Sequence, residues 1–121
     1  MTGSVKVVPM DQVEPISLPR GSWSRMVLTG ATAPGIKSSL GYSIFTPGTV
    51  TASVSHEVEE VAFVLEGNGE LRLDSEAVPF KTGQALFVPP HTWHAVANTG
   101  EQDVVMVFMF PYPDYPPTER R

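Results

Sequence analysis

Alternating polar and apolar residues mark the segment from Thr49 to His56 as a β-strand. Val50, Ala52 and Val54 alternate with threonines and serines, which gives the strand one dry face and one wet face. His56 falls in step with the dry side, which normally faces a core. An inward-pointing imidazole is costly unless it is hydrogen-bonded, paired or bound to a metal. The placement of His56 therefore indicates a functional site.

The next segments have the composition of short strands separated by turns. Glu60–Glu66 is apolar on both faces through its middle, which predicts a strand that is covered on both sides. Gly67-Asn68-Gly69 can adopt positive φ, so we expect a hairpin from Val61 to Leu73. Further strands are expected over residues 5–8, 84–89 and 104–110.

The spacing of turn residues predicts the fold class and the domain organisation. The 121 residues include 10 glycines and 12 prolines, which separate the apolar segments at intervals near ten residues. This pattern predicts an all-β barrel or sandwich with little helix, which we place at residues 25–110. Residues 1–24 form an N-terminal segment that packs on the barrel or on a partner subunit. Residues 111–121 form a Pro-rich tail, either an extended arm that packs its tyrosines on a surface or a solvated tail.

Composition excludes several classes of function. The chain has no cysteine, which excludes disulfides, cysteine-ligated zinc, iron–sulfur clusters and thiol catalysis. Eight basic residues stand against 13 acidic ones, and no basic stripe is present, so we expect no nucleic-acid partner. No apolar run is long enough to cross a bilayer, and the N-terminus does not resemble a signal peptide. We expect a soluble, cytoplasmic protein without a membrane partner.

Spacing selects one carboxylate as a companion for His56. Glu60 lies four residues later and shares its parity in an extended chain, whereas Glu57 and Glu59 do not. His94, on another strand, could complete a cluster from across the barrel. Two imidazoles and one carboxylate make a facial triad, which leaves metal positions open for substrate, water or dioxygen. The alternative is an inward His56–Glu60 pair that is hydrogen-bonded without metal.

Two other polar residues lie close to His94 in the sequence. His91 follows two prolines in a predicted loop, and we consider it as a catalytic residue for proton transfer. The alternative for His91 is a solvated loop histidine. Asn98 is expected to bind backbone groups in a turn rather than to react.

Two segments carry motifs that resemble the signatures of the cupin superfamily. The first family signature is Gly, five residues, His-x-His, three or four residues, Glu, six residues and Gly. The second is Gly, five residues, Pro-x-Gly, two residues, His, three residues and Asn. The matching positions are Gly48, His56, Glu60 and Gly67 in the first, and Gly83, Pro89, His94 and Asn98 in the second. The double match implies a single-domain, jelly-roll β-barrel of the small monocupin type.

The chain departs from the family pattern at two positions. Val54 stands where the family usually has its first histidine, and His91 stands where the second signature usually has glycine. The resemblance therefore implies a reduced ligand set of His56, Glu60 and His94. Three ligands suffice for one divalent catalytic metal, and Fe(II), Mn(II), Ni(II) and Zn(II) all accept such a set.

The resemblance implies a small metal-dependent enzyme that acts on a small organic molecule. The substrate would bind through oxygen atoms, and the aromatic residues of the chain favour a hydrophobic or aromatic one. Similar proteins include dioxygenases, isomerases, cyclases, lyases and decarboxylases, so the reaction stays open. One alternative is a non-catalytic module that senses or stores a small ligand, with Val54 marking a degenerate metal site. Another is a structural dimer that is accessory to a different enzyme.

One apolar face predicts the oligomeric state. Val61, Phe63 and Leu65 lie on the face of their strand opposite Glu60. They need cover from the N-terminal segment, the Pro-rich tail or a second subunit. We therefore expect a homodimer.

Overall fold

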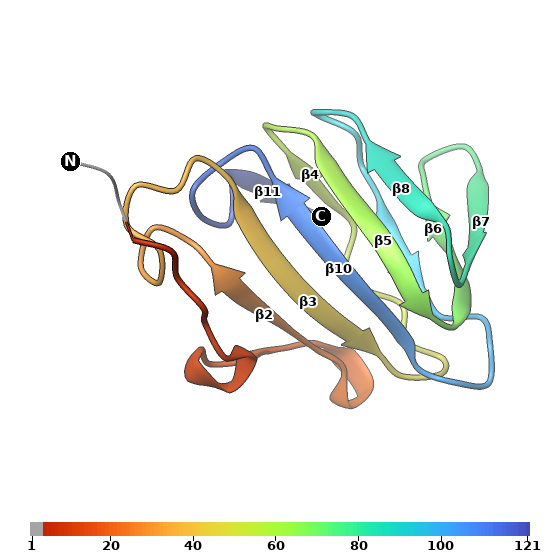
Figure 1. Ribbon diagram of the computed structural model, residues 1–121. Helices are drawn as coiled ribbons and strands as arrows, with labels where there is room; N and C mark the ends of the chain where they lie inside the picture. Colours follow the sequence, from red (N-terminus) through yellow and green to blue (C-terminus); the bar gives the residue numbers. More distant parts are fainter. Residues whose placement is uncertain (1–3) are drawn as a thin grey trace.

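Two facing layers of antiparallel strands build the molecule (Figure 1). The computed structural model describes residues 4–121. The first sheet has six strands in the order β1-β2-β3-β10-β5-β8. Their bounds are β1 Ile16–Ser17, β2 Trp23–Leu28, β3 Ser39–Phe45, β5 Glu60–Glu66, β8 Ala85–Val88 and β10 Val104–Phe110.

The second layer consists of two small groups of strands that backbone bridges join. One group is β7-β6-β9 and the other is β11-β4. Isolated bridges pair Val50 with Ala97 and Val54 with His94, so the β4 segment lies beside β9. The bounds are β4 Val54–His56, β6 Asn68–Arg72, β7 Ala77–Lys81, β9 Ala95–Ala97 and β11 Thr118–Arg120.

The prediction of an all-β barrel with little helix is confirmed. The only helices within residues 4–121 are the single 3₁₀ turns η1, Met10–Gln12, and η2, Pro19–Gly21. Neither is long and apolar enough to cross a membrane. The strands predicted over 84–89 and 104–110 form as β8 and β10. β8 ends before Pro89, as expected of a residue that cannot donate to a sheet ladder.

Aliphatic and aromatic side chains fill one end of the space between the layers. Val64 and Val104 are fully buried there, and each contributes about 1.5–3 kcal/mol by removal of its side chain from water. Phe45 and Met106 belong to this core and also line a cavity at the other end of the barrel. The core therefore forms one wall of the cavity and fixes the strands that carry it.

The expected hairpin from Val61 to Leu73 is wrong. β5 pairs with β10 and β8, whereas β6 pairs with β7 and β9, so the chain changes sheets between β5 and β6. Gly67 makes this corner with φ +89°, and a Cβ atom there would lie 2.5 Å from the carbonyl oxygen of Asp103. Glycine therefore serves a sharp crossing between layers at this position, where a side chain would both strain the backbone and clash.

Three other sequence expectations differ from the structure. The regular part of the predicted strand Thr49–His56 is only β4, because the chain before Val54 makes just one further bridge. Residues 5–8 form no strand, and Val5 is 92% exposed. The predicted cover over both faces of β5 is incomplete, since Phe63 remains 42% exposed on the outer side.

Both terminal segments contribute strands to the barrel. β1 extends the six-stranded sheet beside β2, and η1 lies against β2. Beyond β10 the Pro-rich tail turns back, and β11 pairs with β4 in the other layer (Figure 1). The tail thus lies beside the strand that carries His56.

Candidate metal centre

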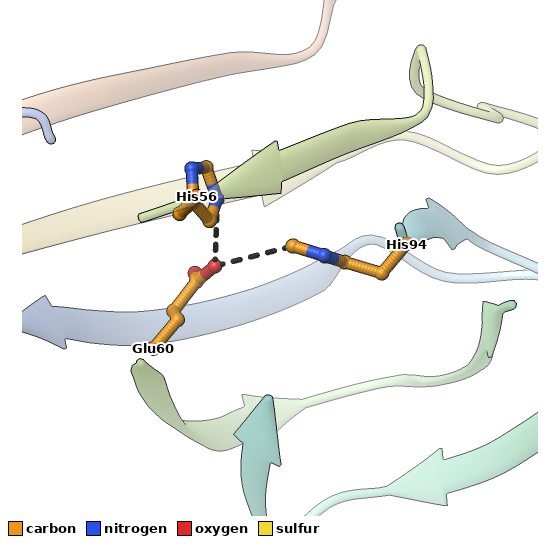
Figure 2. Close-up of side chains that lie close together, drawn as sticks. All are labelled: His56, Glu60 and His94. Carbon is orange, nitrogen blue, oxygen red and sulfur yellow. Dashed lines mark ion pairs between the residues drawn. The ribbon is translucent and has the colours of Figure 1, made fainter. Parts of the chain in front are cut away.

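His56, Glu60 and His94 meet inside the barrel, although they come from three different segments (Figure 2). His56 is the last residue of β4 and Glu60 is the first residue of β5. His94 directly precedes β9, and its backbone N–H and carbonyl both bond to Val54, 2.9 Å in each direction. This bridge fixes His94 against β4, so the second imidazole points into the same space as the first.

The three side chains present one ligand atom each to a common point. Oε1 of Glu60 lies 3.2 Å from Nε2 of His56 and 3.3 Å from Nε2 of His94. One nitrogen or oxygen from each residue falls within 4.8 Å of the other two. Both histidines are buried, and Glu60 is 18% exposed. The predicted set of three residues therefore has the compactness that a single cation requires.

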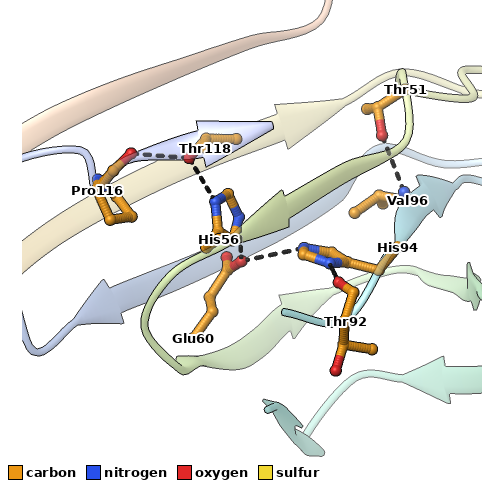
Figure 3. Close-up of polar contacts among 8 residues, drawn as sticks. All are labelled: Thr51, His56, Glu60, Thr92, His94, Val96, Pro116 and Thr118. Atoms are coloured by element: carbon orange, nitrogen blue, oxygen red, sulfur yellow. Dashed lines mark hydrogen bonds and ion pairs between the residues drawn. The ribbon is translucent and has the colours of Figure 1, made fainter. Parts of the chain in front are cut away.

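The tail fixes the tautomer of His56 through Thr118 (Figure 3). The Thr118 hydroxyl donates to the carbonyl oxygen of Pro116 at 2.7 Å, because a carbonyl can only accept. Its oxygen must then accept from Nδ1 of His56, which lies 2.7 Å away. His56 consequently carries its proton on Nδ1 and directs the Nε2 lone pair toward Glu60.

A backbone carbonyl fixes the tautomer of His94 in the same way. Nδ1 of His94 lies 2.8 Å from the carbonyl oxygen of Thr92, so this nitrogen also carries a hydrogen (Figure 3). The Nε2 lone pairs of both histidines and a carboxylate oxygen of Glu60 therefore face one another. Three acceptors in one place need a cation or an added proton between them. A carboxylate with two imidazoles oriented in this way fits a divalent transition metal.

Without a metal, the same contacts shift proton affinities. Burial would raise the pKa of Glu60, but hydrogen bonds with His56 and His94 outweigh it and hold that pKa below its usual value. Burial opposes the charged form of His94, but the hydrogen bonds to Glu60 and to the Thr92 carbonyl, together with the negative charge of Glu60, outweigh it and raise the pKa of His94. The cluster therefore attracts positive charge, supplied by a proton when no metal competes.

A cavity of about 460 Å³ opens beside this cluster. Its volume is within the range of small-molecule sites, about 300–1,000 Å³. The walls are mainly apolar, and Phe110 and Tyr115 both contact the His56 ring edge to face, with centroids 5.0 Å and 5.5 Å away. Burial raises the pKa of Tyr115. The cluster thus lies beside a largely apolar space that can hold an organic molecule.

The structure does not bring His91 to this cavity. His91 is exposed, and its φ of 58° lies in the left-handed region. Its backbone N–H donates to the carbonyl oxygen of His56 at 2.8 Å, so it supports the loop through its main chain. The left-handed φ explains why glycine is usual at this position in the family motif. Proton transfer by the imidazole stays a prediction.

Asn98 binds backbone, as predicted. Its Nδ2 donates to the carbonyl oxygens of Phe45 and Gln102, each at 2.8 Å, and its Oδ1 accepts from the N–H of Gly100 at 2.9 Å. All polar atoms of this buried amide are therefore used in holding the turn that follows β9.

Sequence reasoning missed the contribution of the tail to the site. Thr118 orients a candidate ligand, and Tyr115 and Arg120 line the cavity. The only available signal was the pair of tyrosines among the prolines, which suggested packing on a surface. Nothing in the local pattern shows that residues 118–120 pair with a strand more than 60 positions earlier.

Comparison with known proteins agrees with the fold and the motifs. The family model of the cupin domain matches residues 41–110. An uncharacterized protein, MJ1618, from Methanocaldococcus jannaschii is 32% identical over 106 residues, 87% of this chain and 84% of that protein. The polyketide synthase CurC from Streptomyces cyaneus is 33% identical over 104 residues, 85% of this chain and 67% of that protein.

A solved structure shows the same arrangement of strands. The polyketide cyclase RemF from Streptomyces resistomycificus superposes with a TM-score of 0.79 at 21% identity, covering 97% of this chain and 85% of RemF. Three findings support one family assignment: the match of the family model, the identity with MJ1618 and CurC, and the shared fold. The chain belongs to the cupin family.

Proposed function

We propose that this protein is a metal-dependent enzyme that acts on a small, hydrophobic or aromatic, oxygen-bearing molecule. The observation that carries the proposal is the convergence of three oriented ligand atoms beside an apolar cavity. His56, Glu60 and His94 would hold one divalent ion, with Fe(II), Mn(II), Ni(II) and Zn(II) as candidates. Bound there, the ion would act as a Lewis acid toward a carbonyl or enolate oxygen of the substrate.

The chain's own residues would prepare this chemistry. The aromatic rings of Phe108, Phe110 and Tyr115 line the cavity and exclude water from the bound substrate. Thr118 and the Thr92 carbonyl hold the two imidazoles in one orientation, so the ligand atoms need no rearrangement. Three protein ligands would leave positions open on the side that faces the cavity.

Two of the relatives, CurC and RemF, favour cyclisation of a polyketide-like substrate. CurC is named a polyketide synthase, and RemF is named a polyketide cyclase. Folding an extended, oxygen-rich chain against apolar walls suits the cavity described above. Dioxygenase, isomerase and lyase chemistry would use the same three ligands, so the ligand set alone does not distinguish them.

Metal analysis tests the proposal directly. Protein that has been stripped with chelator and then exposed separately to each of the four ions should bind about one ion per chain. His56→Ala should abolish this binding, whereas His91→Ala, at an exposed residue outside the cavity, should retain it. If the protein binds none of the four ions, the metal-dependent function is refuted. Activity of the His91→Ala variant then tests proton transfer by that residue.

The alternative function is a non-catalytic module that binds a small ligand. The observation that favours it is Val54, which lines the cavity where the family motif usually has a histidine. Weak metal retention with unimpaired binding of an aromatic ligand to stripped protein would support this alternative.

We further propose that a second copy of the chain covers the outer face of the six-stranded sheet. An apolar groove of about 400 Å³ lies over β5, β8 and β10, and Phe87 is 62% exposed there. No charged side chain lines it, so two copies can meet through the same face without burying a charge. Within residues 4–121, the N-terminal segment and tail leave this face open.

Mass measurement in solution tests this interface. Light scattering should give twice the 13.1 kDa chain mass, and Phe87→Glu should shift the protein to monomer. Val78→Glu is the control, because Val78 is 40% exposed on β7 in the other layer. A monomeric wild-type protein at micromolar concentration would refute the proposal.

A further inference from the structure

Arg120 belongs to the inner side of β11, because the register of this strand requires it. Thr118 pairs with His56 and Arg120 pairs with Val54, and directly opposite residues of an antiparallel pair share a face. His56 and Val54 both line the cavity, so Arg120 is turned to the same side, at its rim. The exposure of Arg120 therefore reflects an opening of the cavity rather than the outer surface of the barrel.

Arg120 differs from the other basic residues of the chain in its position at the cavity. It is the only lysine or arginine among the residues that line the cavity. In the part of the chain that the structure describes, it makes no ion pair, whereas Arg72 pairs with Glu70 and Arg121 with Asp74. A planar group with five unengaged donors thus faces the space that would hold a substrate.

We propose that Arg120 binds a carboxylate, or a similar planar oxyanion, at the end of the substrate remote from the metal-binding oxygens. This inference rests on the proposed function of the same cavity. Arg120 is opposite Val54, two residues before His56, so its backbone is about 7 Å along the strand from that of the first ligand. The cavity of about 460 Å³ is large enough for a ring-sized apolar body between the two polar ends. Bidentate geometry would select a planar carboxylate over a neutral amide.

Charge balance supports an anionic ligand at this place. The chain as a whole carries a net charge of −5, which disfavours anions at its general surface. The cavity differs, because its one carboxylate, Glu60, already faces two imidazoles and Arg120 adds a positive charge. A divalent ion at the cluster would increase the local positive charge further. The cavity would then attract an anion that the rest of the surface repels.

A pair of probes of the same shape tests this inference by equilibrium binding. The probes are 6-hydroxy-2-naphthoate and 6-hydroxy-2-naphthamide, measured by calorimetry on Mn(II)-loaded and on chelator-stripped protein. Wild type should prefer the carboxylate by about 10–100-fold, the range expected for a charge-assisted hydrogen bond. Arg120→Gln should lose most of this preference in both forms of the protein. Arg120→Lys should retain part of it.

Arg72→Gln is the matched control, because it removes the same charge from an ion pair outside the cavity. This variant should keep the wild-type preference. An unchanged preference in Arg120→Gln, or an equal loss in Arg72→Gln, would overturn the assignment of Arg120. Equal binding of both probes by wild type would overturn it as well, while leaving the metal-dependent function standing. Binding of neither probe would also overturn the assignment of Arg120, and the separate metal analysis would still decide the metal-dependent function.

Discussion

Replacement of Thr118 by valine would remove the hydroxyl that orients His56 and leave the side-chain shape almost unchanged. In the native protein this hydroxyl accepts from Nδ1 of His56 and donates to the carbonyl of Pro116, both at 2.7 Å. In the variant, Nδ1–H would have no acceptor, and the ring could turn and present either nitrogen to the cluster. We expect weaker metal binding as a result.

The magnitude follows from the burial of the site. Loss of a group that orients a metal-ligating histidine costs about 10–100-fold in metal affinity, or about 1.4–2.7 kcal/mol. His56 is 4% exposed, so solvent can hardly replace the lost acceptor, and we expect a value in the upper half of that range. The stripped protein should also lose about 1–3 kcal/mol of stability, because a buried donor is left unpaired.

Competition with a chromophoric chelator would measure the affinity for each candidate ion at a temperature well below unfolding. Thr118→Ser should restore binding, since it keeps the hydroxyl. Thr51→Val is the matched control: its hydroxyl also lines the cavity, but it accepts from the backbone N–H of Val96 at 2.9 Å (Figure 3). This control should lose stability and keep its metal affinity.

A Thr118→Val variant that binds metal within a factor of two of wild type would refute the reasoning. It would mean that packing against Phe110 and Tyr115 orients the His56 ring without help from the hydrogen bond. An equal loss of affinity in Thr51→Val would also refute it, because the effect would then follow from general loosening of the barrel.

Three further predictions concern other parts of the same loop and cluster. His91→Gly should raise the free energy of unfolding by up to about 1 kcal/mol, measured by urea unfolding. The left-handed backbone costs histidine about 1–2 kcal/mol, and the greater conformational entropy that glycine loses on folding offsets part of the gain. A loss of stability would contradict this. Val54→His should tighten metal binding in the chelator competition by supplying a third imidazole, and so a fourth ligand, beside His94. An unchanged affinity would show that this position does not reach the ion. In stripped protein, the lowered pKa of Glu60 gives stability that is present above about pH 4.5 and is lost as the pH falls through the pKa of the folded state. The raised pKa of His94 acts in the opposite direction. It gives stability that is present below about pH 6.5 and is lost as the pH rises through the pKa of the folded state. The melting temperature should therefore be highest between these limits, and His94→Gln should flatten its fall on the alkaline side; an unchanged alkaline fall would contradict the assignment.

The fold could be predicted because its determinants are local and regularly spaced. Alternation in the Thr49–His56 segment, the double proline after Val88 and the two motifs all lie within short stretches of sequence. Strand pairing is a long-range property, and there the prediction failed. Gly67 fits a hairpin turn as well as it fits a corner between sheets, and only packing against residues 103–104 distinguishes the two.

The candidate site could be predicted in part, for the same reason. Parity linked Glu60 to His56, and the motif spacing added His94, so the convergence of these three side chains was foreseeable. Thr118 was not foreseeable, because its partner lies 62 residues earlier and its own segment has no periodic pattern. For His91 the sequence left two alternatives open, because sequence alone does not give the direction of a loop side chain, and the structure has the exposed one.

The pairing of β11 with β4 has a consequence for the divergence of such proteins. The region matched by the family model ends at residue 110, yet the hydroxyl of Thr118 that accepts from His56 and the guanidinium of Arg120 both come from the tail that follows it. Two chains with identical barrel motifs but different tails would hold the first imidazole differently and offer different charges at the entrance. Exchange of this short terminal strand between homologues would therefore change the ligand preference without any change in the barrel itself.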